Sequence, residues 1–199
     1  MKIQLVTGLL LYRHFYKSIH GWCDFEDIYK EQVEIASDGS HFVEVGTYQG
    51  QSAAYMAVEI ANSEKQIQFD CIDKWKWCWS SIEKADEDDD NKKIKGGAIY
   101  SNFLLNIFPV RDYINPIKEW SADAAPLYED KSVDFVFIDA RHTYDMVTLD
   151  IQSWLPKVKD GGVLAGHDYF DKFPEVIQAV DDYFGDSISV RGNSWIYQN

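Results

Sequence analysis

The sequence predicts a doubly wound α/β fold, in which a mostly parallel sheet has helices on both faces. Short strand-like runs alternate with helix-like stretches almost from end to end, the runs are nearly continuous in apolar residues, and turn residues bound them. Strands buried on both faces have such runs, and their alternation with helices gives right-handed β-α-β crossovers. Because no internal repeat or Pro/Gly-rich linker divides the 199 residues, we expect a single domain over residues 1–199.

Four segments have the strand pattern, being short, rich in β-branched or aromatic residues and bounded by turn residues. They are 41–46 (HFVEVG), 66–72 (QIQFDCI), 133–138 (VDFVFI) and 162–166 (GVLAG). A C-terminal β-hairpin is expected as well, because two further short apolar runs flank a turn. These runs are 188–190 and 194–197, and the turn between them is Arg191-Gly192-Asn193.

Helical patterns lie between the strands. In 52–63 and 143–155 the apolar residues are spaced to share one face, and 173–184 is helical in character. A helical cap is expected over the N-terminal residues 1–39. The acidic and tryptophan-rich residues 74–93 follow neither period, and a substrate loop or a solvated insertion explains them equally well.

The composition restricts the classes of partner. A net charge of -14 repels phosphate and no basic run offsets it, so we expect neither nucleic acid nor an anionic membrane as a partner. The cysteines Cys23, Cys71 and Cys78 form no CxxC pair, which is typical of reduced intracellular thiols. The apolar run 5–12 is too short for a signal peptide or a membrane span. A cytoplasmic protein is therefore predicted, and a homodimer is compatible with it.

The loop after the first predicted strand is the sharpest functional signal. The strand carries Glu44 near its end, Gly46 and Gly50 bracket a turn, and a helix then begins. Ligands of doubly wound sheets bind outside the carboxyl ends of the strands. Gly46 would let the backbone pass close to a ligand, and Gly50 would let the helix start pack tightly. The alternative is a turn that only packs the helix on the strand.

The glycine spacing also restricts the ligand. Gly-x-x-x-Gly is neither the Gly-x-Gly-x-x-Gly of dinucleotide folds nor a nucleotide-phosphate loop, which needs Gly-Lys-Ser/Thr. A ligand without phosphates, such as S-adenosylmethionine (SAM), fits better. Glu44 and Ser52 can meet its ammonium and carboxylate groups. Asp73 ends the second predicted strand, where a carboxylate can accept both ribose hydroxyls.

Residues 42–54 resemble motif I of the class I SAM-dependent methyltransferases, especially the catechol O-methyltransferase branch with its similar Glu-x-Gly-x-Tyr-x-Gly-x-Ser pattern. The resemblance implies a Rossmann-like sheet of seven strands. At the methionine end of SAM it implies cofactor-binding roles for Glu44, Gly46, Thr47, Tyr48, Gly50 and Ser52. It further implies that Asp73 holds the ribose, that Ser121 and Ala122 contact the adenine, and that Trp75 adds an aromatic wall.

Two further strand ends carry polar residues: Asp139 follows one, and His167 and Asp168 follow the next. In a parallel sheet both open on the rim that holds the glycine turn. Residues 133–169 resemble the small-molecule O-methyltransferases that include macrocin O-methyltransferase and proteins once named cephalosporin hydroxylases, through Asp-x-x-His-x-Tyr, Gly-Gly and a later polar pair. The resemblance implies that Asp139, His167 and Asp168 hold a divalent metal cation, with Asp139 also beside the cofactor.

The histidines set this chain apart from those relatives. Oxygen ligands at the polar pair suit magnesium, whereas His167 supplies a nitrogen, which favours manganese, iron or zinc, or no metal. Alternatively His167 is a hydrogen-bonded rim residue and Asp168 a helix cap. His142 stands where catechol-type enzymes have a lysine base, and histidine in general can act as a base near neutral pH, so catalytic roles are expected for His142 and Asp139. Alternatively His142 only orders the rim, together with Tyr144.

The sequence thus predicts a SAM-dependent methyltransferase that acts on a hydroxyl of a small-molecule acceptor, such as a sugar, polyketide or phenol, with a divalent cation assisting. Three alternatives stay open. They are a metal-independent methyltransferase of the same fold, a Rossmann-like NAD-binding oxidoreductase, and a non-catalytic SAM-fold partner protein.

Overall fold

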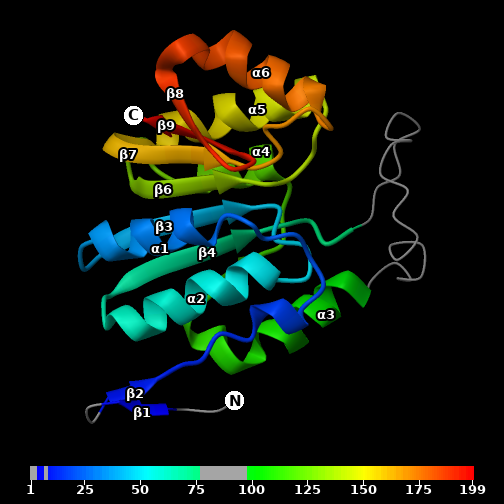
Figure 1. Ribbon diagram of the computed structural model, residues 1–199. Coiled ribbons are helices and arrows are strands. Elements are labelled where there is room, and N and C mark those ends of the chain that lie inside the picture. The colour runs from blue at the N-terminus through cyan, green and yellow to red at the C-terminus, as the bar shows by residue number, and fades with distance from the viewer. Residues whose placement is uncertain (1–3, 7–8, 77–97) are drawn as a thin grey trace.

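The structure, a computed structural model, describes residues 4–6, 9–76 and 98–199. A seven-stranded sheet in the order β5-β4-β3-β6-β7-β9-β8 runs through its centre (Figure 1). The parallel strands are β3 (Ser40–Val45), β4 (Ile67–Ile72), β5 (Asn115–Ile117), β6 (Val133–Ile138) and β7 (Val158–Gly166). β9 (Ser194–Gln198) pairs antiparallel with β7 and with β8 (Ile188–Arg191). The predicted doubly wound, mostly parallel sheet with a C-terminal hairpin is therefore confirmed.

Helices cover both faces of the sheet (Figure 1). On one side lie α1 (Glu26–Ile35), α2 (Gln51–Ser63) and α3 (Ala98–Ile107), and on the other α4 (Ser121–Ala124), α5 (Tyr144–Trp154) and α6 (Pro174–Phe184). Successive strand residues point to opposite faces, which creates two cores. Phe42 and Phe135 belong to the core with α1 and α2, whereas Val43 and Val136 belong to the core with α5 and α6.

The register of the central strands aligns their carboxyl ends. Val45 of β3 pairs with Ile72 of β4 and with Ile138 of β6, and Ile138 pairs in turn with Gly166 of β7. The residue after each of these strand ends therefore lies in one row along one edge of the sheet. This row contains the glycine turn and the polar residues singled out from the sequence.

The N-terminal part differs from the predicted helical cap over residues 1–39. β1 (Gln4–Val6) and β2 (Leu9–Leu11) form an antiparallel pair, a 3-10 turn follows at Tyr16–Ser18, and α1 is the one α-helix of this stretch among the described residues. Helical structure was the wrong prediction for the first strands because a short apolar run has no period that separates strand from helix.

Three further elements, β5, α3 and α4, had no counterpart in the sequence prediction. The edge strand β5 has only three residues and includes Pro116, which an edge strand tolerates because it need not donate on both sides. The helix α3 was also missed. Of the predicted loop 74–93, residues 77–93, and with them Cys78, lie outside the described residues. Within the described part of the chain, every helix is too short or too polar to traverse a membrane.

Candidate functional site

The aligned strand ends open into a single cavity of about 1150 Å³. Its walls include the turn after β3, the ends of β4, β6 and β7, and parts of α4 and α5. Pockets for one small ligand usually measure roughly 300–1,000 Å³. This cavity is therefore large enough for a cofactor together with part of a second molecule.

Glycine is required at the turn after β3. Gly46 has a φ of +90°, and a Cβ atom there would lie 2.0 Å from the carbonyl oxygen of Asp139, so no side chain fits. Next to it, Thr47 lines the cavity, and its buried hydroxyl has no hydrogen-bond partner among the residues that the structure describes. A close backbone approach beside an unsatisfied hydroxyl fits the polar amino-acid end of a ligand such as SAM.

Asp73 connects the end of β4 to this turn through hydrogen bonds to the backbone. Its Oδ2 accepts a hydrogen bond from the Tyr48 N–H at 2.9 Å, and its Oδ1 accepts one from the Trp75 N–H at 2.6 Å. Burial raises the pKa of Asp73, and these backbone hydrogen bonds oppose the shift. Both oxygens keep further acceptor capacity, and Asp73 lines the cavity. Asp73 is thus rigidly placed to accept hydroxyl groups.

Backbone strain concentrates around the cavity. Five described residues other than glycine have positive φ, and three of them, Tyr48, Trp75 and Asp168, line the cavity. Such conformations cost on the order of 1–3 kcal/mol each and persist where the surroundings fix them, which is common at ligand sites. The indole N–H of Trp75 donates to the carbonyl oxygen of Tyr48 at 2.8 Å and so ties two of the strained positions together.

Glu44, Ser52 and Gly50 occupy different depths behind the turn. The Ser52 hydroxyl lines the cavity and donates to Glu44 Oε1 at 2.5 Å, while Glu44 is buried behind it and is not part of the wall. Burial raises the pKa of Glu44 to about 8, against the effect of the Ser52 hydrogen bond. Gly50 begins α2 and packs against Ile107 and Phe103. In contrast with the expectation, Glu44 and Gly50 thus support the turn from behind.

The expected adenine end includes a residue that the sequence analysis missed. Ser121 and Ala122 line the cavity, and the Ser121 hydroxyl oxygen accepts a hydrogen bond from the Trp154 indole at 2.9 Å. Asp150, on α5 one turn before Trp154, also lines the cavity although it is only 5% exposed. A carboxylate within the apolar stripe of 143–155 is the signal that identifies it.

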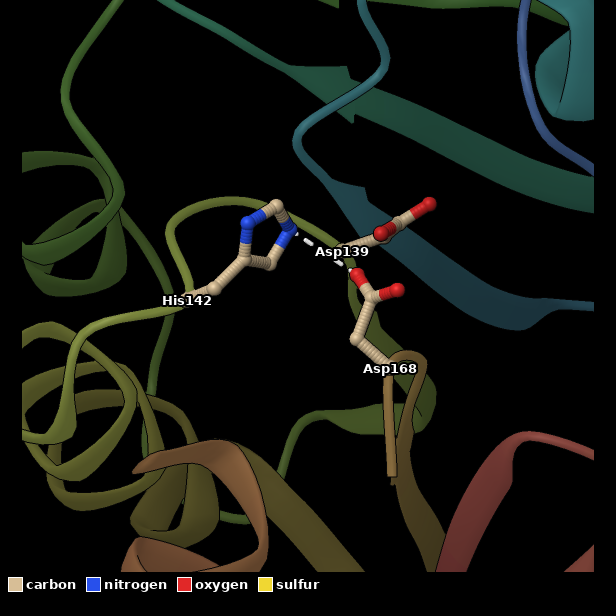
Figure 2. A group of neighbouring side chains, drawn as sticks. All are labelled: Asp139, His142 and Asp168. Carbon is tan, nitrogen blue, oxygen red and sulfur yellow. Dashed lines mark ion pairs between the residues drawn. The ribbon is translucent and has the colours of Figure 1, made fainter. Parts of the chain in front are cut away.

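Three side chains from the segments that follow β6 and β7 point toward one another, and all three residues line the cavity (Figure 2). Asp139, His142 and Asp168 each offer a ligand atom, and these atoms lie within 4.8 Å of one another. His142 Nε2 is 2.9 Å from Asp168 Oδ2 (Figure 2). Two carboxylates and an imidazole at this spacing form a donor set that suits a divalent cation.

The charges within this cluster are strongly linked. Burial raises the pKa of Asp139 to about 7, with the charge of His167 opposing and that of Asp168 adding to the shift. Burial would also raise the pKa of Asp168, but hydrogen bonds from His142 and His167 outweigh it and hold that pKa well below its usual range. One carboxylate is therefore firmly ionised beside another that titrates near neutrality.

His167 lies next to this cluster but points its Nε2 elsewhere. That nitrogen donates to Asp24 Oδ1 at 2.8 Å, while Nδ1 lies 3.3 Å from Asp168 Oδ1 and 3.8 Å from Asp139 Oδ1. Burial would lower the pKa of His167, but the Asp168 hydrogen bond and the neighbouring carboxylates raise it to about 9. His142 thus forms the closest group with the two carboxylates, and His167 faces the same pair through Nδ1.

The segment 20–24, before α1, closes one side of the cavity and was also missed. Trp22 stacks on Tyr48 with ring centroids 5.9 Å apart, and Asp24 receives hydrogen bonds from His167 and from Asn193 Nδ2. Asp24 and His167 are 143 positions apart in the chain, so no local spacing relates them.

Comparison with known protein families and structures agrees with a methyltransferase fold. A family model described as a methyltransferase domain matches residues 43–169, well over half of the chain. This chain belongs to that methyltransferase family. Its strand order and antiparallel C-terminal hairpin are those of the class I SAM-dependent methyltransferases. The NAD-binding alternative is thereby set aside.

Two solved structures illustrate the shared fold. The O-methyltransferase NovP superposes with a TM-score of 0.65 at 17% identity, over 87% of this chain and 78% of that one. CalS11, a calicheamicin methyltransferase, has a TM-score of 0.62 at 12% identity, over 87% and 76%. Among curated proteins, y4gI of Sinorhizobium fredii is 25% identical over 126 residues. That match spans 63% of this chain but only 13% of y4gI.

Proposed function

We propose that this chain transfers the methyl group of SAM to a hydroxyl of a small-molecule acceptor, next to Asp139, His142 and Asp168. One observation carries the proposal: the glycine turn and the carboxylate–histidine cluster share a cavity and touch each other. A Cβ atom on Gly46 would lie 2.0 Å from the Asp139 carbonyl oxygen. A ligand on the turn therefore lies beside the cluster.

The cofactor side follows the row of strand ends. Gly46, Thr47 and Ser52 would hold the methionine part, Asp73 the ribose, and Ser121 with Ala122 the adenine, while Trp75 walls the same side. SAM, when bound, supplies an electrophilic methyl group on a sulfonium that is already a good leaving group. The main task of the chain is therefore alignment, which can supply roughly 7–11 kcal/mol of barrier lowering.

On the acceptor side the cluster prepares the hydroxyl oxygen. Asp139, Asp168 and His142 converge closely enough to hold a divalent cation, which would polarise the acceptor oxygen. Two neighbouring carboxylates, one with a pKa raised to about 7, favour a cation between them. Mixed oxygen and nitrogen donors suit manganese, iron or zinc as well as magnesium.

The 2.9 Å pair of His142 and Asp168 supports a second, metal-independent form of the same reaction. Here His142 removes the hydroxyl proton as the methyl group is transferred, and the Asp168 carboxylate stabilises the resulting imidazolium. A chelator separates the two forms, because it would stop turnover only in the form that needs a cation.

The names of two proteins with a similar fold support a small-molecule hydroxyl acceptor. NovP is named an O-methyltransferase, and CalS11 a calicheamicin methyltransferase. At such low sequence identity these proteins share only the fold with this chain. The proposal of a hydroxyl acceptor therefore depends on the geometry of Asp139, His142 and Asp168.

A methyl-transfer assay tests the proposal. The protein is incubated with SAM labelled in the methyl group and with sugars, phenols and hydroxylated polyketides, with and without EDTA. We expect label on a hydroxyl oxygen, and a loss of at least about 100-fold in Asp139→Asn. Asp171→Asn, which changes an exposed carboxylate near β7, is the matched control. A folded protein that binds SAM but labels no hydroxyl would contradict the proposal.

A further inference from the structure

A buried carboxylate, that of Asp150, lines the cavity, and the proposed transfer gives it no role. Asp150 lies on α5 and is 5% exposed, yet it lines the cavity together with Met146 and Leu149 of the same helix. A carboxylate in an apolar wall is costly unless donors satisfy it. The hydrogen-bond partners of Asp150 therefore indicate which kind of ligand group could bind at this part of the cavity.

Hydrogen bonds within the protein use only part of the acceptor capacity of this carboxylate. Ser121 donates a hydrogen bond to it, and the Ser121 oxygen is itself fixed by the Trp154 indole N–H at 2.9 Å. Arg141 contributes charge, but its guanidinium lies over the Trp120 ring at 5.5 Å from the centroid. A carboxylate has about four acceptor positions, so Asp150 keeps capacity for a donor that arrives from the cavity.

The cavity wall that includes Asp150 also offers apolar side chains, against which a flat heterocycle can pack. Apolar surface comes from Ala122 and Ala140 as well as from Met146 and Leu149, and Trp120 stands at the rim. The position along the sheet is also informative. Gly46 follows β3, Asp73 follows β4, and Ser121 comes after β5, so a ligand extended from the turn past Asp73 places its base here.

We propose that Asp150 accepts a hydrogen bond from the exocyclic 6-amino group of the cofactor's adenine and thereby selects adenosine over purine nucleosides without an amino group at that position. The remaining acceptor positions of the carboxylate and the edge of a base lying against Ala122 and Leu149 make this contact available. Asp150 is thus a specificity-determining residue for the cofactor. The assignment depends on SAM binding, and not on the acceptor or on any cation.

Calorimetric binding of three nucleosides tests the assignment without turnover. They are S-adenosylhomocysteine, its 6-oxo analogue S-inosylhomocysteine, and the analogue with hydrogen at the purine 6 position. Hydrogen bonds to charged groups are the stronger ones, so we expect the wild-type protein to bind the amino compound on the order of 10- to 100-fold more tightly than either analogue.

The variant Asp150→Asn distinguishes recognition of the 6-amino group from a purely structural role of Asp150. Its amide N–H can donate to a 6-oxo group, so the preference for the amino compound over the 6-oxo analogue should fall to about threefold or less, or reverse. Asp123→Asn, which removes another carboxylate of the same cavity, should keep the wild-type preference. Thermal unfolding monitored by circular dichroism shows whether each variant is folded.

Two results would overturn the assignment: equal binding of the three nucleosides by the wild-type protein, or an unchanged preference in folded Asp150→Asn. If Asp150→Asn fails to fold, the wild-type comparison of the 6-amino and 6-hydrogen compounds decides alone. Failure of all three nucleosides to bind would also refute it. A negative result in the hydroxyl-transfer assay, by contrast, leaves these binding ratios unaffected.

Discussion

The two sides of the cavity differ in what forms them: the backbone on the cofactor side, and side chains on the acceptor side. On the cofactor side the backbone sets the shape, through the positive φ of Gly46 and the left-handed Tyr48 and Trp75 clamped by Asp73. On the acceptor side five side chains from three segments meet, and the backbone only carries them: Asp24, Asp139, His142, His167 and Asp168. Substitutions on the first side should therefore abolish binding, whereas substitutions on the second should change chemistry or charge balance in a chain that still folds.

The largest effect is expected from Gly46→Ala. The added Cβ would lie 2.0 Å from the Asp139 carbonyl oxygen at a φ of +90°, so the turn must move. We expect loss of detectable S-adenosylhomocysteine binding and a loss of at least about 3 kcal/mol in the free energy of unfolding. Calorimetry and urea denaturation measure the two quantities.

Gly39→Ala is the matched control for this substitution. Its φ is +85°, but nothing lies within 4 Å of the added Cβ. It should cost only about 1 kcal/mol and leave cofactor binding intact. Equal behaviour of the two variants would show that the close approach of Gly46 to the end of β6 does not matter.

On the acceptor side, Asp168→Asn should lower the rate of methyl transfer at least about 100-fold while the Kd for S-adenosylhomocysteine stays within about threefold. The reason is that Asp168 contacts His142 and Asp139, not the glycine turn. Initial rates and calorimetry on the same preparation provide both numbers. A fall in affinity as large as the fall in rate would remove the distinction between the two sides.

The two histidines divide the acceptor side further. His167→Ala leaves Asp24 and the buried Asp168 without a shared partner, so we expect a loss of about 2–4 kcal/mol in the free energy of unfolding. His142→Ala removes a half-exposed side chain and should cost less than about 1 kcal/mol, although methyl transfer falls steeply. The reverse order of stabilities, measured by urea denaturation, would contradict this division.

A further effect concerns pH and Glu44. Burial raises its pKa from 4.5 to about 8, so the folded chain holds this proton more tightly than the unfolded chain. The resulting contribution to stability is complete below pH 4.5 and is lost as the pH rises through 8. Glu44→Gln removes this dependence, so its free energy of unfolding should improve relative to wild type across that range. Parallel pH profiles from urea denaturation would exclude a buried, protonated Glu44.

The same contrast explains what the sequence could predict. Gly46 and Asp73 were found because a turn after a strand and an acidic strand end are local patterns. Asp139 and Asp168 were brought together correctly because parallel strands end at one edge, as the register of Val45 with Ile138 shows. These predictions required only neighbouring residues and the direction of the strands.

The remaining residues depend on tertiary contacts that no spacing encodes. Asp24 contacts His167 Nε2 from 143 positions away, and His142 joins Asp139 and Asp168 in the group of possible metal ligands. Glu44 was placed at the ligand, although the alternation of strand side chains directs it, like Phe42, toward the buried side under α2. Asp150 interrupts the apolar stripe of 143–155, but its place in the cavity wall depends on the packing of α5 beside Ser121.

A crystal structure with bound S-adenosylhomocysteine tests the central claim, that one cavity aligns cofactor and acceptor, most directly. The account predicts the homocysteine part against the Gly46 turn, the ribose on Asp73, and the sulfur directed toward Asp139, His142 and Asp168. A sulfur atom directed away from these three side chains, or a ligand bound outside the row of strand ends, would contradict it.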